Sequence, residues 1–164
     1  MSKKLKDVIW IKNDYKQSID SVKELLDSTG KGFCLAKFTQ ATIHLGQGTV
    51  HSCHHPKTHT IPLSELENNP SALFNTTVLQ TARQEMFDGK RPSECDYCWR
   101  IEDSGETSDR HFKSLAEWAL PVHDTIVESK STDIFYPTAL EVDFSNACNF
   151  ACSYCGPEYS SKWV

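Results

Sequence analysis

Residues 148–157 read CNFACSYCGP, and they directly follow a segment of alternating character, residues 139–144 (ALEVDF). The alternation predicts a short strand, because successive side chains of a strand point to opposite faces. The loop after this strand carries Cys148, Cys152 and Cys155 in a C-x3-C-x2-C spacing. Three thiolates on one loop can each bind a different iron of a cubic iron–sulfur cluster. No fourth cysteine follows them, so one iron would keep an open position, as catalytic metal sites do.

The other four of the seven cysteines form a second group, Cys34, Cys53, Cys95 and Cys98. Residues 33–43 are rich in β-formers and are followed by Gly46 and Gly48, which predicts a hairpin that returns Cys53 toward Cys34. Together with the C-x2-C pair, these residues would make a closed four-thiolate site. Zinc and iron–sulfur clusters both use such sites, and residue types alone do not separate them.

The bulk composition excludes several classes of function. The chain is 38% hydrophobic and 24% charged, as ordinary globular proteins are. Its net charge of −5 offers no basic field for nucleic acid or an anionic membrane surface. No apolar run approaches the roughly 20 residues of a membrane span, and residues 8–11 are too short for a signal-peptide core. An odd cysteine count without such a signal argues against a disulfide framework, so we expect a cytoplasmic protein with free thiols.

The loop CNFACSYC resembles the cluster-binding loop of the radical S-adenosylmethionine (radical SAM) superfamily. That pattern is C-x3-C-x-aromatic-C, placed after the first strand of a (β/α) barrel, and Tyr154 supplies the aromatic residue. The resemblance implies that Cys148, Cys152 and Cys155 hold a [4Fe–4S] cluster whose open iron binds the amino and carboxylate groups of S-adenosylmethionine. One electron from the cluster would then cleave this cofactor to methionine and a 5′-deoxyadenosyl radical, so an electron donor is an expected partner.

The four-cysteine group resembles the SPASM/twitch domains, which accompany many radical SAM enzymes and carry auxiliary [4Fe–4S] clusters. The spacing C-x13-G-x4-C runs from Cys34 through Gly48 to Cys53. Around the C-x2-C pair, the chain from Arg83 to Arg110 reads R-x2-M-x2-G-x-R-P-x-E-C-x2-C-W-x2-E-x2-G-x2-S-x-R. The resemblance implies one auxiliary [4Fe–4S] cluster on these four cysteines, in a domain that precedes the barrel instead of following it. Whole enzymes of this kind often modify peptides or proteins, and small molecules are the other substrate class we expect.

We therefore expect an α+β fold, a small twitch-like iron–sulfur domain followed by the first β/α segment of an incomplete (β/α) radical SAM barrel. We expect four parts: an N-terminal helical segment (residues 1–29), the auxiliary-cluster domain (30–110), a linker helix (111–136) and the start of the barrel (137–164). A barrel needs about 200 residues or more. We expect the remaining strands elsewhere in a longer chain or in a partner chain, and these 164 residues to be inactive alone.

Local patterns predict the individual elements. Residues 18–27 and 111–127 have helical periodicity, with an end or kink at Pro121 in the second segment. Ser64 opens a capping box and a short helical turn. Asn75 is expected to cap a helix with an apolar stripe formed by Val78, Leu79, Ala82 and Met86. The C-x2-C pair is expected in the loop after that helix.

Other interpretations remain open on the residues alone. The four-cysteine group could bind zinc in a non-catalytic interaction module, or the chain could be a simple iron–sulfur electron-transfer protein. His51, His54 and His55 are expected in a solvated turn or as donors to cluster sulfurs, and less often as metal ligands. Glu102 and Arg110 could pair with each other or contact a substrate, but we expect them on the solvated surface. Asp143 and Asn146 are expected to cap the cysteine loop instead of taking part in chemistry.

Overall fold

The strand expected near residue 140 is present, and it belongs to the sheet of the four-cysteine unit. The computed structural model describes residues 15–134, 136–157 and 160–163. In it, β4 (Ala139–Asp143) pairs in parallel with β1 (Gln40–His44), from Gln40 opposite Ala139 to His44 opposite Asp143. The predicted hairpin is also present, because β2 (Thr49–His51) returns antiparallel to β1. Gly48 makes the turn with a φ of +64°, a left-handed conformation that glycine adopts without steric cost.

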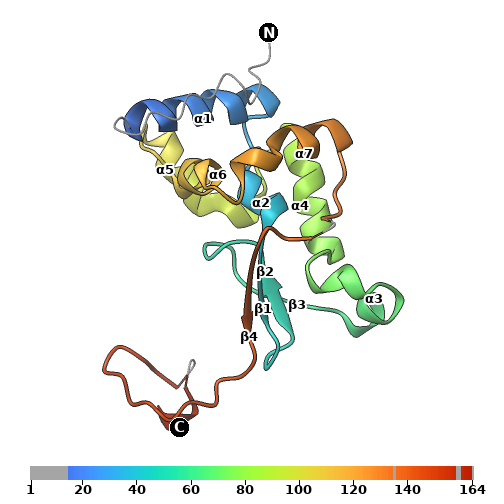
Figure 1. The fold of residues 1–164 in the computed structure, drawn as a ribbon, viewed down its shortest axis with the longest axis vertical. Helices are drawn as coiled ribbons and strands as arrows, with labels where there is room; N and C mark the ends of the chain where they lie inside the picture. Colours follow the sequence, from blue (N-terminus) through green and yellow to red (C-terminus); the bar gives the residue numbers. More distant parts are fainter. Residues whose placement is uncertain (1–14, 135, 158–159, 164) are drawn as a thin grey trace.

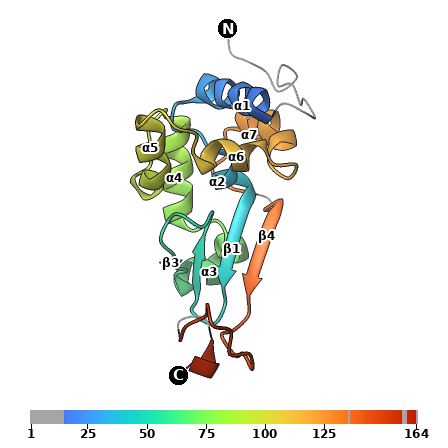
Figure 2. The ribbon, with the colours of Figure 1, turned by 90° about the vertical axis from the view of Figure 1, so that its left-hand side faces the viewer.

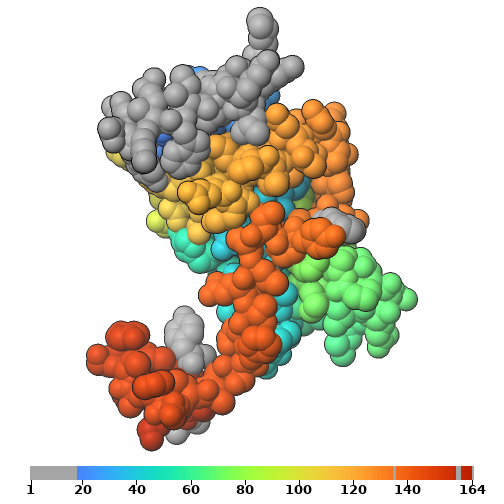
Figure 3. Space-filling model, in the orientation of Figure 1, coloured from blue at the N-terminus to red at the C-terminus, as the bar shows by residue number. Residues whose placement is uncertain are grey.

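A short fourth strand, β3 (His59–Thr60), completes a sheet in the order β3-β2-β1-β4. Parallel strands need a crossover connection, and the crossover between β1 and β4 contains the rest of the sheet and most of the helices. Most of the helices gather at the end of the sheet where β1 and β4 begin, whereas α3 lies at the level of the strands. The three-cysteine loop leaves from the opposite end of the sheet (Figures 1 and 2). In the space-filling view the residues after β4 form a projection beyond the sheet (Figure 3).

The helices are α1 (Tyr15–Thr29), α2 (Leu35–Thr39), α3 (Leu63–Asn68), α4 (Thr77–Phe87), α5 (Asp96–Asp103), α6 (Asp109–Leu115) and α7 (His123–Ser129), with 3₁₀ turns at Pro70–Leu73, Ser93–Cys95, Leu120–Val122 and Ser161–Trp163. The first confirms the amphipathic helix predicted from periodicity, since Val22, Leu25 and Leu26 are fully buried. It ends as predicted at Gly30, whose N–H donates to the Leu26 carbonyl at 2.9 Å.

Two apolar clusters hold the molecule together, and α4 contributes to both. The larger cluster lies among the helices and includes Leu25, Phe33 and Met86. The smaller cluster lies against the sheet and consists mainly of Ile43, Val50, Ile61 and Leu79. Met86 and Leu79 are two turns apart on α4, so this helix joins the helical half to the sheet.

The apolar stripe of α4 differs from the predicted one by one residue. Leu79, Ala82 and Met86 are buried as expected, but Val78 is 49% exposed and Arg83 is fully buried. Positions 79, 82, 83 and 86 follow the helical spacing i, i+3, i+4, i+7, so an arginine fills a core-facing position that the pattern treats as polar. The Arg83 guanidinium donates to the carbonyls of Lys37, Phe74 and Thr132 and to the Asn75 side chain, at 2.7–2.9 Å.

Two predicted helix caps were wrong. The cap of α4 is Thr76, whose hydroxyl accepts from the Leu79 N–H at 3.3 Å. Asn75 instead bonds Arg83 and both backbone groups of Ile134, so tertiary contacts take the side chain that the sequence assigned to the cap. Ser64 lies inside α3, which begins after Pro62 without a side-chain cap.

Three segments take a local structure different from the predicted one. The first half of residues 33–43 forms α2, and only Gln40–His44 is a strand. The Cys95–Cys98 pair lies at the start of α5 instead of in a loop. Residues 111–127 divide between α6, which ends at Leu115, and α7, and Pro121 lies in the 3₁₀ turn before α7. A continuous helix could not pass through Pro121, which lacks the N–H and would clash with the carbonyl four residues earlier.

Candidate metal centres

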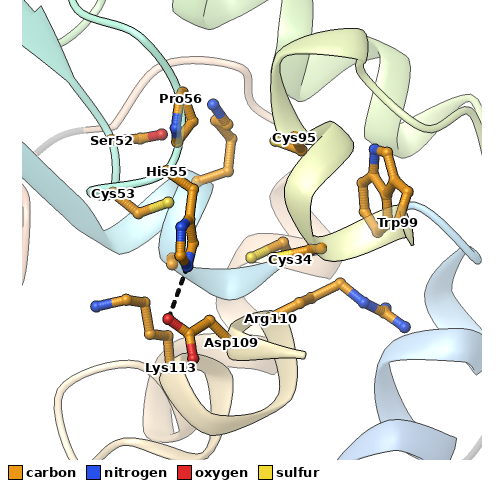
Figure 4. Close-up of a pocket in the computed structure, with 13 residues that line it drawn as sticks. Cys34, Ser52, Cys53, His55, Pro56, Cys95, Trp99, Asp109, Arg110 and Lys113 are labelled. Atoms are coloured by element: carbon orange, nitrogen blue, oxygen red, sulfur yellow. Dashed lines mark hydrogen bonds and ion pairs between the residues drawn. The ribbon is translucent and has the colours of Figure 1, made fainter. Parts of the chain in front are cut away.

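The fold brings the four separated cysteines of the first group to one cavity. Cys34 precedes α2, and Cys53 follows β2, which runs antiparallel to β1 and therefore ends beside the start of β1. Cys95 and Cys98 are three residues apart at the start of α5, so both face the same side of the helix. All four line a cavity that is partly open to solvent (Figure 4).

The spacing of the sulfur atoms bears on what the cavity can hold. Among the described residues, the only histidine, cysteine or carboxylate ligand atoms that lie in threes within 4.8 Å of one another are those of His54, His55 and Asp109. No three of the cysteine sulfurs therefore come so close. A single tetrahedral zinc with Zn–S bonds of about 2.3 Å would hold its sulfurs about 3.8 Å apart. A four-iron cluster holds them farther apart, because each thiolate binds a different iron. In the unliganded chain no three of the sulfurs have the spacing of a tetrahedral zinc site.

Burial controls the protonation of these thiols. Desolvation raises the pKa of Cys53 to about 11 and that of Cys95 to about 12, and it also raises the pKa of Cys98. The neighbouring Cys34 thiol acts in the same direction at all three. Without a bound metal or cluster the three thiols stay protonated at neutral pH, and binding of either would displace these protons.

Hydrogen-bond donors and cations surround the sulfurs and favour their thiolate forms. The His55 backbone N–H donates to Cys53, and the Arg110 backbone N–H donates to Cys98. The Lys37 ammonium also lowers the pKa of Cys53 and Cys95, and Lys37 itself is buried in an ion pair with Glu94. The cavity therefore presents positive groups to a ligand set that carries negative charge when deprotonated.

The predicted surface position of Glu102 and Arg110 was wrong, because the two form a buried ion pair behind the cavity. Arg110 Nε and Nη2 donate to the Glu102 carboxylate, both at 2.8 Å. Arg110 also donates to the Phe33 carbonyl at 2.9 Å and to Asp27 at 3.1 Å. Since Phe33 precedes Cys34, this one guanidinium connects α1, α5 and α6 to the segment that carries the first cysteine.

The three-cysteine loop lies at the other end of the sheet. β1 and β4 are five residues long, so at about 3.3 Å per residue about 15 Å of strand lies between the two cysteine groups. Cys148, Cys152 and Cys155 are each partly exposed, and Tyr154 is 91% exposed. The loop is held by its own backbone, with the Cys155 N–H donating to the Cys152 carbonyl at 3.0 Å.

The residues expected to cap this loop have other partners. The Asp143 carboxylate lies 3.3 Å from His44 Nδ1 on the neighbouring strand. Asn146 contributes its carbonyl, which accepts from the Ser161 N–H at 2.8 Å, and the Ser161 hydroxyl accepts from the Cys148 N–H at 3.2 Å. The segment after the loop therefore folds back onto its start.

The histidines near Cys53 divide between two environments. His51 Nδ1 donates to the Cys53 carbonyl at 2.5 Å, and its Nε2 lies 3.2 Å from His44 Nε2. His54 and His55 point instead at Asp109. No sequence pattern indicated that Asp109 and Lys37 lie beside this cavity, because each reaches it through a contact between segments far apart in the chain.

In comparisons with known proteins, no protein-family model, no curated protein and no solved structure matches the chain. Within the described residues, no helix combines the length and the apolar character needed to cross a bilayer.

Proposed function

We propose that this chain is part of a radical SAM enzyme and that it binds two [4Fe–4S] clusters, an auxiliary one in the four-cysteine cavity and a catalytic one on the three-cysteine loop. When bound, the catalytic cluster with S-adenosylmethionine on its open iron supplies the electron that releases methionine and a 5′-deoxyadenosyl radical. The observation that carries the proposal is the convergence of Cys34, Cys53, Cys95 and Cys98 on one cavity.

The residues around this cavity suit a buried cluster. Backbone N–H groups donate to two of its four sulfurs. Lys37 and Arg110 supply positive charge next to the thiolates. Such neighbours stabilise the thiolate ligands and raise the reduction potential of a cluster, since they favour the more negative form.

The role proposed for the three-cysteine loop rests on its motif and its surroundings. Cys148, Cys152 and Cys155 follow the carboxyl end of a parallel strand, and the loop is open to solvent, as a site that admits a second molecule must be. The Tyr154 ring is almost fully exposed and is free to cover a bound cluster from outside. The strands that complete a barrel would come from outside the present sequence, in the same protein or in a partner. Free thiols and oxygen-sensitive clusters suit a reducing compartment, so we propose a cytoplasmic location.

The test is the iron, acid-labile sulfide and zinc content of the full chain after anaerobic reconstitution, compared with two variants. We expect about eight irons per chain, four for each of two [4Fe–4S] clusters, and no stoichiometric zinc in the cavity. Cys148→Ala should remove the loop cluster and leave about four irons, and Cys95→Ala should remove the cavity cluster with a similar loss. Ser153→Ala, an exposed non-ligand in the same loop, is the matched control and should retain all the iron.

Electron paramagnetic resonance separates the proposed enzyme from an electron-transfer protein. Added S-adenosylmethionine should change the spectrum of the reduced loop cluster in the wild type and in Cys95→Ala, since its amino and carboxylate groups bind the open iron. Full iron retention in Cys148→Ala would disprove the loop assignment. Zinc without acid-labile sulfide in the wild type would mean that the cavity is a structural zinc site and not a cluster site. A spectrum unchanged by S-adenosylmethionine would indicate an electron-transfer protein instead of a radical SAM enzyme.

A further inference from the structure

A separate group of metal-ligand atoms lies beside the four-cysteine cavity. His54 and His55 follow Cys53, and Asp109 is the first residue of α6. His54 Nε2 lies 3.1 Å and His55 Nε2 lies 2.7 Å from the same oxygen, Asp109 Oδ2. Figure 4 shows the His55 ring reaching down to the Asp109 carboxylate. Two imidazoles from one loop thus converge on a carboxylate from a segment more than fifty residues later.

The neighbouring residues hold His55 and Asp109 in place before any ion binds. The His55 side chain is 14% exposed, and its ring stacks on Tyr97 with ring centroids 3.8 Å apart and planes at 16°. The His55 backbone N–H donates a hydrogen bond to the Cys53 sulfur. Asp109 follows the α6 cap Ser108, whose hydroxyl accepts from the Arg110 N–H at 3.2 Å. The loop and the helix are therefore positioned independently of each other.

The donor set has the chemistry of a zinc site with an open position. Two neutral imidazole nitrogens and one carboxylate oxygen are ligands that Zn²⁺ accepts, and sites with three protein ligands bind water as the fourth. Zn–N and Zn–O bonds of about 2.0–2.2 Å in tetrahedral geometry separate the ligand atoms by about 3.3 Å. The two imidazole nitrogens would each move away from Asp109 Oδ2 by a few tenths of an ångström to admit the ion.

We propose that His54, His55 and Asp109 bind a Zn²⁺ ion at the rim of the four-cysteine cavity, with water as the fourth ligand. The site uses none of the seven cysteines as a ligand, so the cavity can hold its own metal or cluster at the same time. His54 is 57% exposed and Asp109 is 36% exposed, so an ion and its water can enter from solvent. The Lys113 ammonium acts on His54 and opposes a cation there, which gives the proposal a further test.

The experiment is a Zn²⁺ titration of the full chain with the cavity already loaded, with bound zinc measured by elemental analysis after dialysis. We expect one additional Zn²⁺ per chain. His54→Ala and Asp109→Asn should each weaken Zn²⁺ binding by at least about tenfold. Loss of a residue that only orients a metal ligand already costs about tenfold, and loss of the ligand itself should cost at least as much. His44→Ala, which removes an imidazole from the neighbouring strand, should leave the binding unchanged. Lys113→Gln should strengthen it about twofold to fivefold, the effect of one exposed charge.

Co²⁺ in place of Zn²⁺ identifies the ligands by absorption spectroscopy. The expected spectrum has the d–d bands of a nitrogen- and oxygen-ligated ion without thiolate-to-cobalt charge transfer. Because His54 is exposed, His54→Ala should fold normally, and circular dichroism checks this. Absence of the additional Zn²⁺, a thiolate signature, or binding that is equal in the wild type, His54→Ala and Asp109→Asn would each overturn the proposal.

Discussion

Glu102→Gln removes the carboxylate that faces Arg110 behind the four-cysteine cavity. Both side chains are buried, with 8% of Glu102 and 2% of Arg110 exposed. The carboxylate accepts two hydrogen bonds of 2.8 Å from Arg110 and one of 2.5 Å from the Ser108 hydroxyl. Glutamine keeps one acceptor oxygen but turns an NH₂ group toward the guanidinium. The substitution therefore leaves a buried cation with only part of its pairing.

The size of the effect follows from that geometry. Removing one partner of a buried ion pair costs about 3–5 kcal/mol. Asp27 still lies 3.1 Å from Arg110 and is 39% exposed, so it compensates in part. We therefore expect a loss of about 3 kcal/mol in the free energy of unfolding, a large share of the about 5–15 kcal/mol typical of a domain.

The effect should depend on pH in a defined direction. Burial acts to raise the pKa of Glu102, but hydrogen bonds from Arg110 and Ser108 and the charge of Arg110 outweigh it, so the pKa lies below the ordinary value of 4.5. A depressed carboxyl pKa contributes stability above the unfolded value, and this contribution is lost as pH falls through the folded value. The difference between wild type and Glu102→Gln should therefore shrink in acid.

The assay is urea unfolding of the reduced chain in one defined metal state, followed by circular dichroism. Asp103→Asn is the matched control, because it makes the same charge change one residue later in an ion pair with Arg91, where Asp103 is 63% exposed. We expect the control to lose less than about 1 kcal/mol. If Glu102→Gln and Asp103→Asn lose the same free energy at neutral pH, the reasoning on the buried pair is wrong.

Three further predictions test the packing of α4 and the titration of His111. Leu79→Ala should lower the free energy of unfolding by about 2–5 kcal/mol in urea titrations, whereas its exposed neighbour Val78→Ala should have almost no effect. Arg83→Lys should lower the thermal midpoint strongly, because an ammonium cannot replace the four hydrogen bonds of the guanidinium, and Arg100→Lys in an exposed pair should not. Burial and then the charge of Arg110 lower the pKa of His111 to about 4, so the unfolded chain binds a proton between pH 6.5 and about 4 that the folded chain does not. The thermal midpoint should therefore decrease as the pH is lowered from 6.5 to about 4. His111→Gln should make the midpoint less dependent on pH in this range.

The sequence by itself determined the features that lie within one element or one loop. The periodicity of residues 18–27 predicted α1 and its buried face, and Gly30 predicted its end. Alternation predicted β4, and Gly48 predicted the hairpin between β1 and β2. The cysteine spacings defined two groups of candidate ligands. Each of these depends on neighbours a few residues apart, whose geometry the backbone fixes locally.

The tertiary structure decided which of these parts meet. β4 pairs with β1 across ninety-nine positions, and the helical pattern of α4 could not indicate that Arg83 would be buried among distant carbonyls. The same holds for Glu102 with Arg110 and for His54 and His55 with Asp109, which are surface-type residues until two segments are packed together. A local sequence pattern shows whether a side chain is polar. Whether that side chain is buried or can bind a metal depends on its partner residue, and only the packing of segments far apart in the chain brings the two together.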